Sequence, residues 1–254
     1  MDGLFLRVAI RNKKGDTDNN LADYDKIVEI DPNVKLIEVI YVNRSTIYLK
    51  NGEFEKALAD LDKAVSINPK VPEVFLARAI AKLLKDDCTG AIADYDKSID
   101  LRPNFSAAFS GRGDCRLRQN DSDGALTDYN KAISLNSKEA DVYVKRGIVR
   151  GLKNDFSGAL NDLQAGANLN PKSVSRESRG IYNFPYKSLN NLIRKNPENA
   201  KLFVLRGIFH KFQLKNTEAE SDFNMALTLD ASVKKTISDV YVFFQNQPAN
   251  KSSK

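Results

Sequence analysis

Apolar and small residues recur along this chain at helical spacing in consecutive pairs of blocks, and short polar or glycine-containing breaks separate the two blocks of each pair. Such breaks are Lys14-Gly15-Asp16, Asn51-Gly52, Asn120-Asp121 and Asn154-Asp155. The second block often ends at a proline, which cannot continue a helix, as at Asp31-Pro32, Asn68-Pro69, Arg102-Pro103 and Asn170-Pro171. The pattern therefore predicts a series of helix–turn–helix hairpins.

The hairpins repeat with a period of 34 residues, which a repeated arginine in the first helix and a repeated aspartate in the second make visible. These residues are Arg44, Arg78, Arg112 and Arg146, and Asp60, Asp94, Asp128 and Asp162. The series extends back to Arg7 and Asp23 across an insertion of three residues, and forward to Arg206 and Asp222 after a shortened repeat. A fixed period of this length indicates a solenoid, in which each hairpin packs on its neighbours.

Three kinds of side chain recur at fixed places in the repeat. A large residue near the start of the first helix, a small residue four positions later and an alanine early in the second helix let two backbones approach while the large side chains fill the next groove. They are Tyr41, Phe75, Phe109, Tyr143 and Phe203, with Leu4 in the first repeat; Ser45, Ala79, Gly113, Gly147 and Gly207, with Val8; and Ala57, Ala91, Ala125, Ala159 and Ala219, with Asn20 as the exception.

This pattern resembles the tetratricopeptide repeat (TPR) family over residues 1–233. The resemblance implies an all-α, right-handed superhelical solenoid of about six helix-turn-helix repeats with one degenerate repeat and a C-terminal capping helix. The expected repeats are 1–34, 38–71, 72–105, 106–139, 140–173 and 200–233, with the degenerate repeat at 174–199, the capping helix at 234–246 and a disordered tail at 247–254.

The degenerate repeat is about eight residues shorter than the others. Pro185 stands where the second helix should carry its alanine, and Ser188 stands in the place of the aspartate. The shortening is either a functional bend in the solenoid or ordinary repeat decay.

The spacing of sixteen residues between arginine and aspartate predicts that they face each other across the hairpin. We expect structural ion pairs Arg7–Asp23, Arg44–Asp60, Arg78–Asp94, Arg112–Asp128, Arg146–Asp162 and Arg206–Asp222. An exposed pair contributes about 0.2–1 kcal/mol, whereas leaving one buried partner unpaired costs about 3–5 kcal/mol. The pairs would therefore fix the registry of each hairpin.

Composition narrows the possible chemistry. The chain has 42% hydrophobic and 28% charged residues and a net charge of +6, which suits a folded protein. The absence of a long apolar run and of a secretory signal leads us to expect a cytoplasmic protein, or an exported one if a leader has been trimmed. The two cysteines, Cys88 and Cys115, are too few for a disulfide framework or a four-cysteine metal site, and we expect them to be structural.

No residue suggests catalysis. The single histidine, His210, stands where the family places a packed aromatic side chain, so a core role is expected. We assign no catalytic residue, metal or cofactor, and expect a non-enzymatic protein.

The resemblance also implies that the first helices line a concave groove that receives a peptide segment. The expected lining is largely apolar, with Asn43, Asp114 and Lys145 setting the orientation of the peptide. Residues at the ninth place of a repeat could equally pack against neighbouring helices. The expected set is Phe5, Val42, Asn43, Leu76, Ile80, Asp114, Val144, Lys145, Ile148 and Val204.

The chaperone C-terminal tail is a poor candidate for the peptide. The family's carboxylate clamp needs Lys and Asn in one repeat, where this chain has Phe5 and Ala9, and basic residues two repeats later, where it has Glu73 and Ala77.

The sequence thus predicts a protein–protein interaction scaffold or adaptor whose partner it does not identify. The net positive charge leaves an RNA-binding superhelix open as an alternative. A regulatory or substrate-recruiting portion of a larger enzyme is a further alternative.

Overall fold

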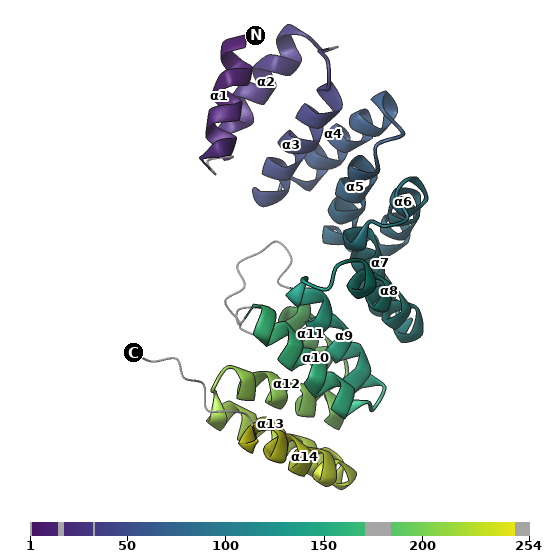
Figure 1. Cartoon of the computed structure of the whole chain (residues 1–254), viewed down its shortest axis with the longest axis vertical. Helices are drawn as coiled ribbons and strands as arrows, with labels where there is room; N and C mark the ends of the chain where they lie inside the picture. The colour runs from purple at the N-terminus through teal and green to yellow at the C-terminus, as the bar shows by residue number, and fades with distance from the viewer. Residues whose placement is uncertain (1, 15–17, 33, 171–183, 247–254) are drawn as a thin grey trace. The chain divides into compact units, whose positions relative to one another are not determined.

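The structure is a computed structural model that describes residues 2–14, 18–32, 34–170 and 184–246. The described residues form helices without strands, and they divide into an N-terminal body, residues 1–121, and a C-terminal body, residues 122–254 (Figure 1). The expected all-α class is confirmed. Residues 174–183 of the expected degenerate repeat and the expected tail 247–254 lie outside the described residues.

The N-terminal body contains seven α-helices and one 3₁₀ turn among its described residues. They are α1 (Asp2–Lys13), η1 (Asp18–Asn20), α2 (Leu21–Ile30), α3 (Ile37–Lys50), α4 (Phe54–Ile67), α5 (Pro72–Leu84), α6 (Cys88–Leu101) and α7 (Ser106–Arg118).

The described part of the C-terminal body contains a further seven α-helices and one 3₁₀ turn. They are α8 (Ser122–Leu135), α9 (Ala140–Leu152), α10 (Phe156–Leu169), α11 (Phe184–Lys195), α12 (Ala200–Phe212), α13 (Asn216–Leu229), η3 (Ala231–Val233) and α14 (Lys234–Gln245).

Within each body, successive helices pack as hairpins, and these hairpins pack on one another. In the N-terminal body α3 pairs with α4 and α5 with α6, and α4 and α6 in turn contact the first helix of the following hairpin. The small side chains make this possible, because Ala57, Ala79 and Ala91 are completely buried at the helix contacts. The repeat architecture predicted from the period of 34 residues is therefore confirmed.

A left-handed residue closes the turn inside each described hairpin from the second repeat on. Its φ is +77° at Gly52, +64° at Asp86, +65° at Asn120 and +69° at Asn154. Glycine, asparagine and aspartate tolerate this conformation, which explains the polar and glycine breaks in the sequence. The fifth case, Leu214 with φ +58°, lacks that tolerance.

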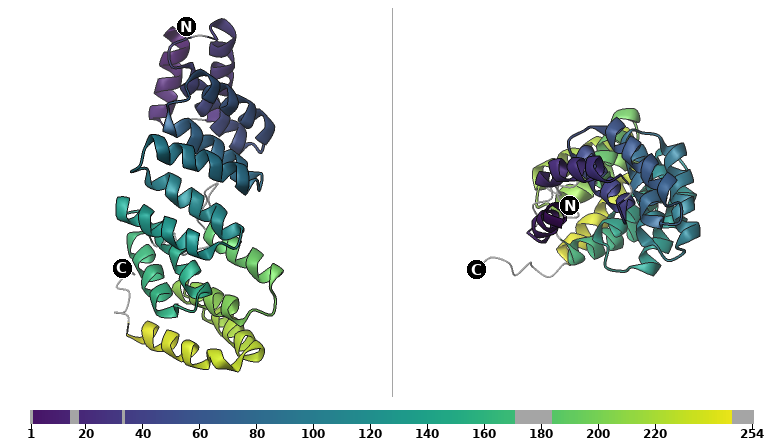
Figure 2. Two further views of the ribbon diagram at one scale, coloured as in Figure 1. Left: turned by 90° about the vertical axis from the view of Figure 1, so that its right-hand side faces the viewer. Right: turned by 90° about the horizontal axis from the view of Figure 1, so that it is seen from above.

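Three buried clusters form the core. Two lie in the N-terminal body, one around Tyr24 and Tyr41 and one around Tyr95. The third, in the C-terminal body, includes Leu189 of α11, Phe209 of α12 and Val240 of α14. Figure 2 shows α14, coloured yellow, beside α13, and the ring of Tyr241 packs on Phe223 with centroids 5.6 Å apart.

The shortened repeat changes the packing of the C-terminal body. The first helix of the following hairpin, α12, packs directly on α9, which is the first helix of the preceding hairpin. The contact is close, since a Cβ atom on Gly151 would lie 2.2 Å from Leu205 Cδ2. In the described part of the chain, no helix combines the length and the apolar character that crossing a bilayer requires.

Candidate functional site

The repeated arginines of the first helices lie against the repeated aspartates of the second helices. Five of the expected pairs show this contact: Arg7–Asp23, Arg44–Asp60, Arg78–Asp94, Arg146–Asp162 and Arg206–Asp222. In these pairs the aspartates are between 3% and 4% exposed, and each guanidinium donates to both carboxylate oxygens. The distance from Arg7 Nε to Asp23 Oδ2 is 2.6 Å, and the Nη2–Oδ1 distance is 2.7 Å in Arg44–Asp60 and 2.6 Å in each of Arg78–Asp94, Arg146–Asp162 and Arg206–Asp222. We call this series the arginine–aspartate ladder.

The remaining expected pair, Arg112–Asp128, has one member in each body. Asp128 is 1% exposed. The pairing of these two residues stays a prediction.

A second basic side chain reaches the same aspartate in four repeats. It comes from the position four residues after the ladder arginine, and its nitrogen lies 2.7–3.2 Å from the carboxylate: Arg11 with Asp23, Lys82 with Asp94, Arg150 with Asp162 and His210 with Asp222. His210 is buried as expected, but it contacts a carboxylate instead of serving only as apolar packing. Bidentate and charge-assisted contacts of this kind compensate the cost of burying a carboxylate.

The ladder arginine also joins neighbouring repeats. It donates to an acidic or amide side chain of the preceding second helix at 2.6–3.2 Å, in Arg44–Asp25, Arg78–Asp62, Arg112–Asp96, Arg146–Asn130 and Arg206–Asn190. Our sequence analysis missed these acceptors. A signal was present, because Asp or Asn stands two residues after the ladder aspartates Asp23, Asp60, Asp94 and Asp128, and Asn190 stands two residues after Ser188, which replaces the aspartate.

The same arginines stack on the large residue of the first helix. Their guanidinium carbon lies 5.3–5.7 Å from the ring centroid in Arg44–Tyr41, Arg78–Phe75, Arg112–Phe109, Arg146–Tyr143 and Arg206–Phe203. The three-residue separation places both side chains on one face of the helix. The arginine is thus held by its own repeat and by the preceding one.

The charged contacts alter the acidity of two ladder aspartates. The hydrogen bond from Arg7 is the main reason that the pKa of Asp23 lies below its ordinary value. Burial acts in the opposite direction on Asp222, but hydrogen bonds from His210 and Arg206 outweigh it, so the pKa of Asp222 is also lowered.

The expected groove residues fall into two groups by exposure. Phe5, Val42, Asn43, Leu76 and Ile80, all in the N-terminal body, are partly exposed. They lie on α1, α3 and α5, the first helices of three successive repeats. A small pocket of about 170 Å³ opens beside Asn43, where Asn12, Thr46 and Lys50 contribute polar groups.

The other five expected groove residues are buried. Their side chains are Asp114 (5% exposed), Val144 (0%), Lys145 (8%), Ile148 (2%) and Val204 (0%). Val144, Ile148 and Val204 belong to the core of the C-terminal body, together with Leu189 and Ile193 of α11. The packing of α11 and α12 on α9 thus buries apolar residues that we expected to line the groove.

The cysteines contact each other inside the N-terminal body. Cys88 of α6 and Cys115 of α7 are buried free thiols within hydrogen-bonding reach. Burial raises the pKa of both thiols, which is the opposite of what a nucleophile needs. Among the residues that the structure describes, no three His, Cys, Asp or Glu side chains gather in a way that could hold a metal ion.

Fold and side-chain geometry together define a class, the all-helical tandem-repeat proteins built from hairpins of about 34 residues. The family follows from comparison with sequence models, since residues 39–71 and 76–140 match two models that are both described as tetratricopeptide repeat. The chain therefore contains tetratricopeptide repeats, as its sequence pattern suggested. No curated protein matches it by sequence.

Solved tetratricopeptide structures share the fold at low sequence identity. A tetratricopeptide repeat protein from Parabacteroides merdae is 18% identical with a TM-score of 0.58, and the match covers 96% of this chain and 98% of that one. MamA is 22% identical with a TM-score of 0.54 over 64% of this chain and 93% of its own. YrrB, described as having an unusual peptide-binding site, is 15% identical with a TM-score of 0.51 over 85% and 96%.

Proposed function

We propose that the protein is an interaction scaffold that binds a peptide segment of a partner on the first-helix surface of its N-terminal body. The observation that carries the proposal is the set of partly exposed side chains Phe5, Val42, Leu76 and Ile80. Phe5, Val42 and Leu76 stand at the same place of the repeat on α1, α3 and α5, and Ile80 lies one helical turn after Leu76, so an extended or helical segment that runs along the repeats could contact all of them.

The polar pocket beside Asn43 supports the same proposal. Asn12, Asn43 and Lys50 offer side-chain donors around an opening of about 170 Å³, and Thr46 is exposed at its edge. Amide and ammonium donors suit backbone carbonyl or carboxylate oxygens of a peptide. Apolar contacts would supply affinity, and this pocket would fix direction and register.

The buried positions of Asp114 and Lys145 change one part of the expected mechanism. Side chains that are 5% and 8% exposed have little surface to offer a ligand, so Asn43 remains as the orienting group. That YrrB is described as a peptide-binding tetratricopeptide protein agrees with the proposed class of ligand.

Affinity capture tests the proposal. We expect the intact chain to retain partners that a Val42→Glu, Leu76→Glu variant loses by at least about tenfold, because a charge at the centre of an apolar contact costs more than about 1.4 kcal/mol. The matched control is Ile30→Glu, Ile67→Glu, which changes residues 59% and 47% exposed at the ends of second helices. Circular dichroism of both variants checks that they retain the helical fold. Equal capture by all three proteins would refute the assigned surface.

Salt dependence separates the proposal from RNA binding. A partner held mainly by apolar contacts stays bound when salt is raised from 50 to 500 mM. RNA held by lysine and arginine would instead lose affinity linearly on a logarithmic salt scale, roughly in proportion to the number of phosphate contacts.

A further inference from the structure

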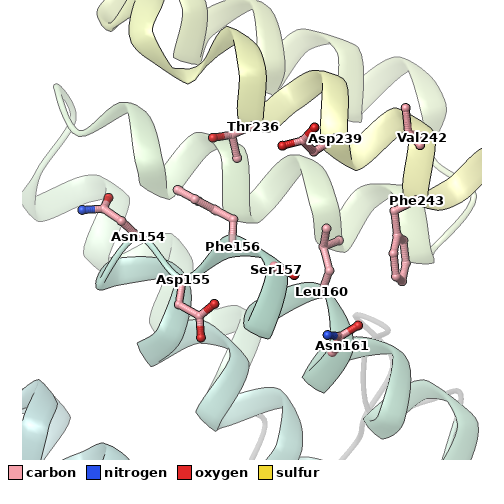
Figure 3. Close-up of a pocket in the computed structure, with 10 residues that line it drawn as sticks. All are labelled: Asn154, Asp155, Phe156, Ser157, Leu160, Asn161, Thr236, Asp239, Val242 and Phe243. Carbon is pink, nitrogen blue, oxygen red and sulfur yellow. The ribbon is translucent and has the colours of Figure 1, made fainter.

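An open cleft of about 500 Å³ lies between α10 and α14 in the C-terminal body. Its apolar side chains are Phe156 and Leu160 from α10 and Val242 and Phe243 from α14. In Figure 3, Phe156 and Leu160 point toward α14, and Phe243 points from α14 toward α10. Val242 is 50% exposed, although most apolar side chains of this helix are covered.

Polar side chains border the cleft without partners from the described residues. Asn154, Ser157 and Asp239 line it, and none of the three side chains makes a hydrogen bond or ion pair within the described ranges 2–14, 18–32, 34–170 and 184–246. Asn154 and Ser157 lie in the turn before α10 and in its first turn, and Asp239 lies on α14.

Equivalent side chains at an earlier hairpin have partners. Asn154 and Ser157 stand 68 residues after Asp86 and Thr89. Arg118 Nη1 at the end of α7 donates to Asp86 Oδ1 at 2.7 Å, and Gln119 Nε2 donates to Thr89 Oγ1 at 3.3 Å. The C-terminal end of α7, the first helix of the following repeat, thus covers the start of α6.

Two further hairpins show the same arrangement. Lys153 Nζ at the end of α9 donates to Asp123 Oδ1 on α8 at 2.6 Å, and Lys85 after α5 pairs with Glu55 on α4. Ser157 holds the equivalent place on α10. In this chain, the start of a second helix therefore receives a basic or amide side chain from the C-terminal end of an antiparallel helix.

The ends of helices make that arrangement electrostatically favourable. The N-terminus of α10 carries a partial positive charge, which the partial negative charge at the C-terminus of an antiparallel neighbour complements. A lysine or arginine in the last turn of such a neighbour would reach the acceptors that border the cleft.

We propose that the cleft between α10 and α14 binds a basic amphipathic α-helix of a protein partner. Its apolar face packs on Phe156, Leu160, Val242 and Phe243, and a lysine or arginine near its C-terminus pairs with Asp239 and hydrogen-bonds with Asn154 or Ser157. This site is separate from the first-helix surface proposed above, and neither proposal depends on the other.

The probe is a fluorescent peptide with the sequence of Pro72–Lys85, PEVFLARAIAKLLK, because this helix presents Lys85 to the start of a second helix inside the chain. Fluorescence anisotropy with the full chain should show saturable binding. We expect a Lys82→Glu, Lys85→Glu peptide to bind at least about tenfold more weakly. Equal binding of the two peptides would overturn the proposed chemistry.

Protein variants locate the binding. Val242→Lys should weaken the Pro72–Lys85 peptide by at least about tenfold and Asp239→Lys by at least about threefold, since both introduce repulsion and the first also removes apolar contact. The matched control, Met225→Lys on α13, changes a residue 46% exposed and should alter affinity less than twofold. The Val42→Glu, Leu76→Glu variant should also bind normally, which separates this test from that of the proposed function.

Hydrogen exchange and sedimentation complete the test. Peptide should protect amides in residues 156–161 and 236–243 of the wild-type chain. Protection elsewhere only, or undiminished binding by the folded Asp239→Lys variant, would overturn the proposal. So would a concentration-dependent dimer that Val242→Lys abolishes, because the cleft would then hold a second copy of this chain.

Discussion

Each ladder aspartate occupies an almost closed site between two helices, where an unpaired carboxylate would be costly. Asp94 is 4% exposed and lies within 2.7 Å of both Arg78 and Lys82. By contrast, the side chain of Asp96, two residues later, is 48% exposed. It forms an ion pair with Arg112 of the following repeat. The two carboxylates allow a direct comparison of buried and exposed pairing.

We predict that Asp94→Ala lowers the free energy of unfolding by about 3 kcal/mol, because it leaves Arg78 and Lys82 without their shared acceptor. The exposed Asp96→Ala should cost less than about 1 kcal/mol. Urea denaturation of both variants measures the difference. The structural role of the ladder is wrong if Asp94→Ala and the further variant Asp128→Ala melt no earlier than a surface Lys→Ala control.

The lowered pKa of Asp222 predicts acid sensitivity. The unfolded carboxyl has a pKa of about 3.9, so its pairing stabilises the folded protein above that pH, and the stabilisation is lost as pH falls through the lower folded-state value. Asp222→Asn should therefore be less stable than wild type at pH 7, with the gap narrowing below about pH 4. Denaturation midpoints between pH 7 and pH 2 measure this. A constant gap would contradict it.

Sequence reasoning worked for five of the six expected arginine–aspartate contacts within a repeat because the spacing is local and periodic, and Arg112–Asp128 stays a prediction. Asp25, Asp62 and Asp96 were missed because their bonds to the following repeat arise from stacking, and a count along one hairpin does not include the neighbouring hairpin. His210 was placed correctly in the interior, but its carboxylate partner became evident only in the folded hairpin.

At the scale of the helices, the turn inside the hairpin is the most restrictive feature. Four of the five described turns inside hairpins have Gly, Asp or Asn at the left-handed position, and Leu214 is the exception; Leu36, with φ +64°, lies between two hairpins. Its side chain is 80% exposed, so packing does not compensate its backbone strain.

We predict that Leu214→Asn raises the free energy of unfolding by about 0.5–1 kcal/mol, since asparagine adopts positive φ at lower cost. The reciprocal change Asn120→Leu, at an equivalent turn with φ +65°, should lower it by a similar amount. Thermal denaturation of the two variants provides the measurement. Loss of stability in Leu214→Asn would show that leucine makes a contribution that its exposure does not reveal.

At the scale of the whole chain, stability in a repeat protein is approximately a sum of local terms, because most contacts of a hairpin are internal or with the hairpins beside it. Gly207 illustrates such a local term, since a Cβ atom there would lie 2.4 Å from the buried ring of Phe223. Gly3 has no atom within 4 Å of the same added Cβ.

We predict that Gly207→Ala reduces hydrogen-exchange protection in α12 and α13 and leaves α3 to α6 unchanged, because overpacking costs about 1–3 kcal/mol where it occurs. Gly3→Ala, the matched control, should be neutral or slightly stabilising. A uniform loss of protection along the chain would show that the hairpins unfold as one cooperative unit.

The sequence by itself determined the helices, the period of 34 residues, the tetratricopeptide class and the facing of arginine and aspartate, because all of these follow from local spacing and backbone preference. Tertiary structure decided which first-helix side chains stay accessible. Val42 and Leu76 remain partly exposed, whereas Val144 and Val204 are buried where α11 and α12 pack on α9. Equivalent places in a repeat have the same local geometry, but their exposure depends on which helix packs next to them, and only the tertiary structure determines that.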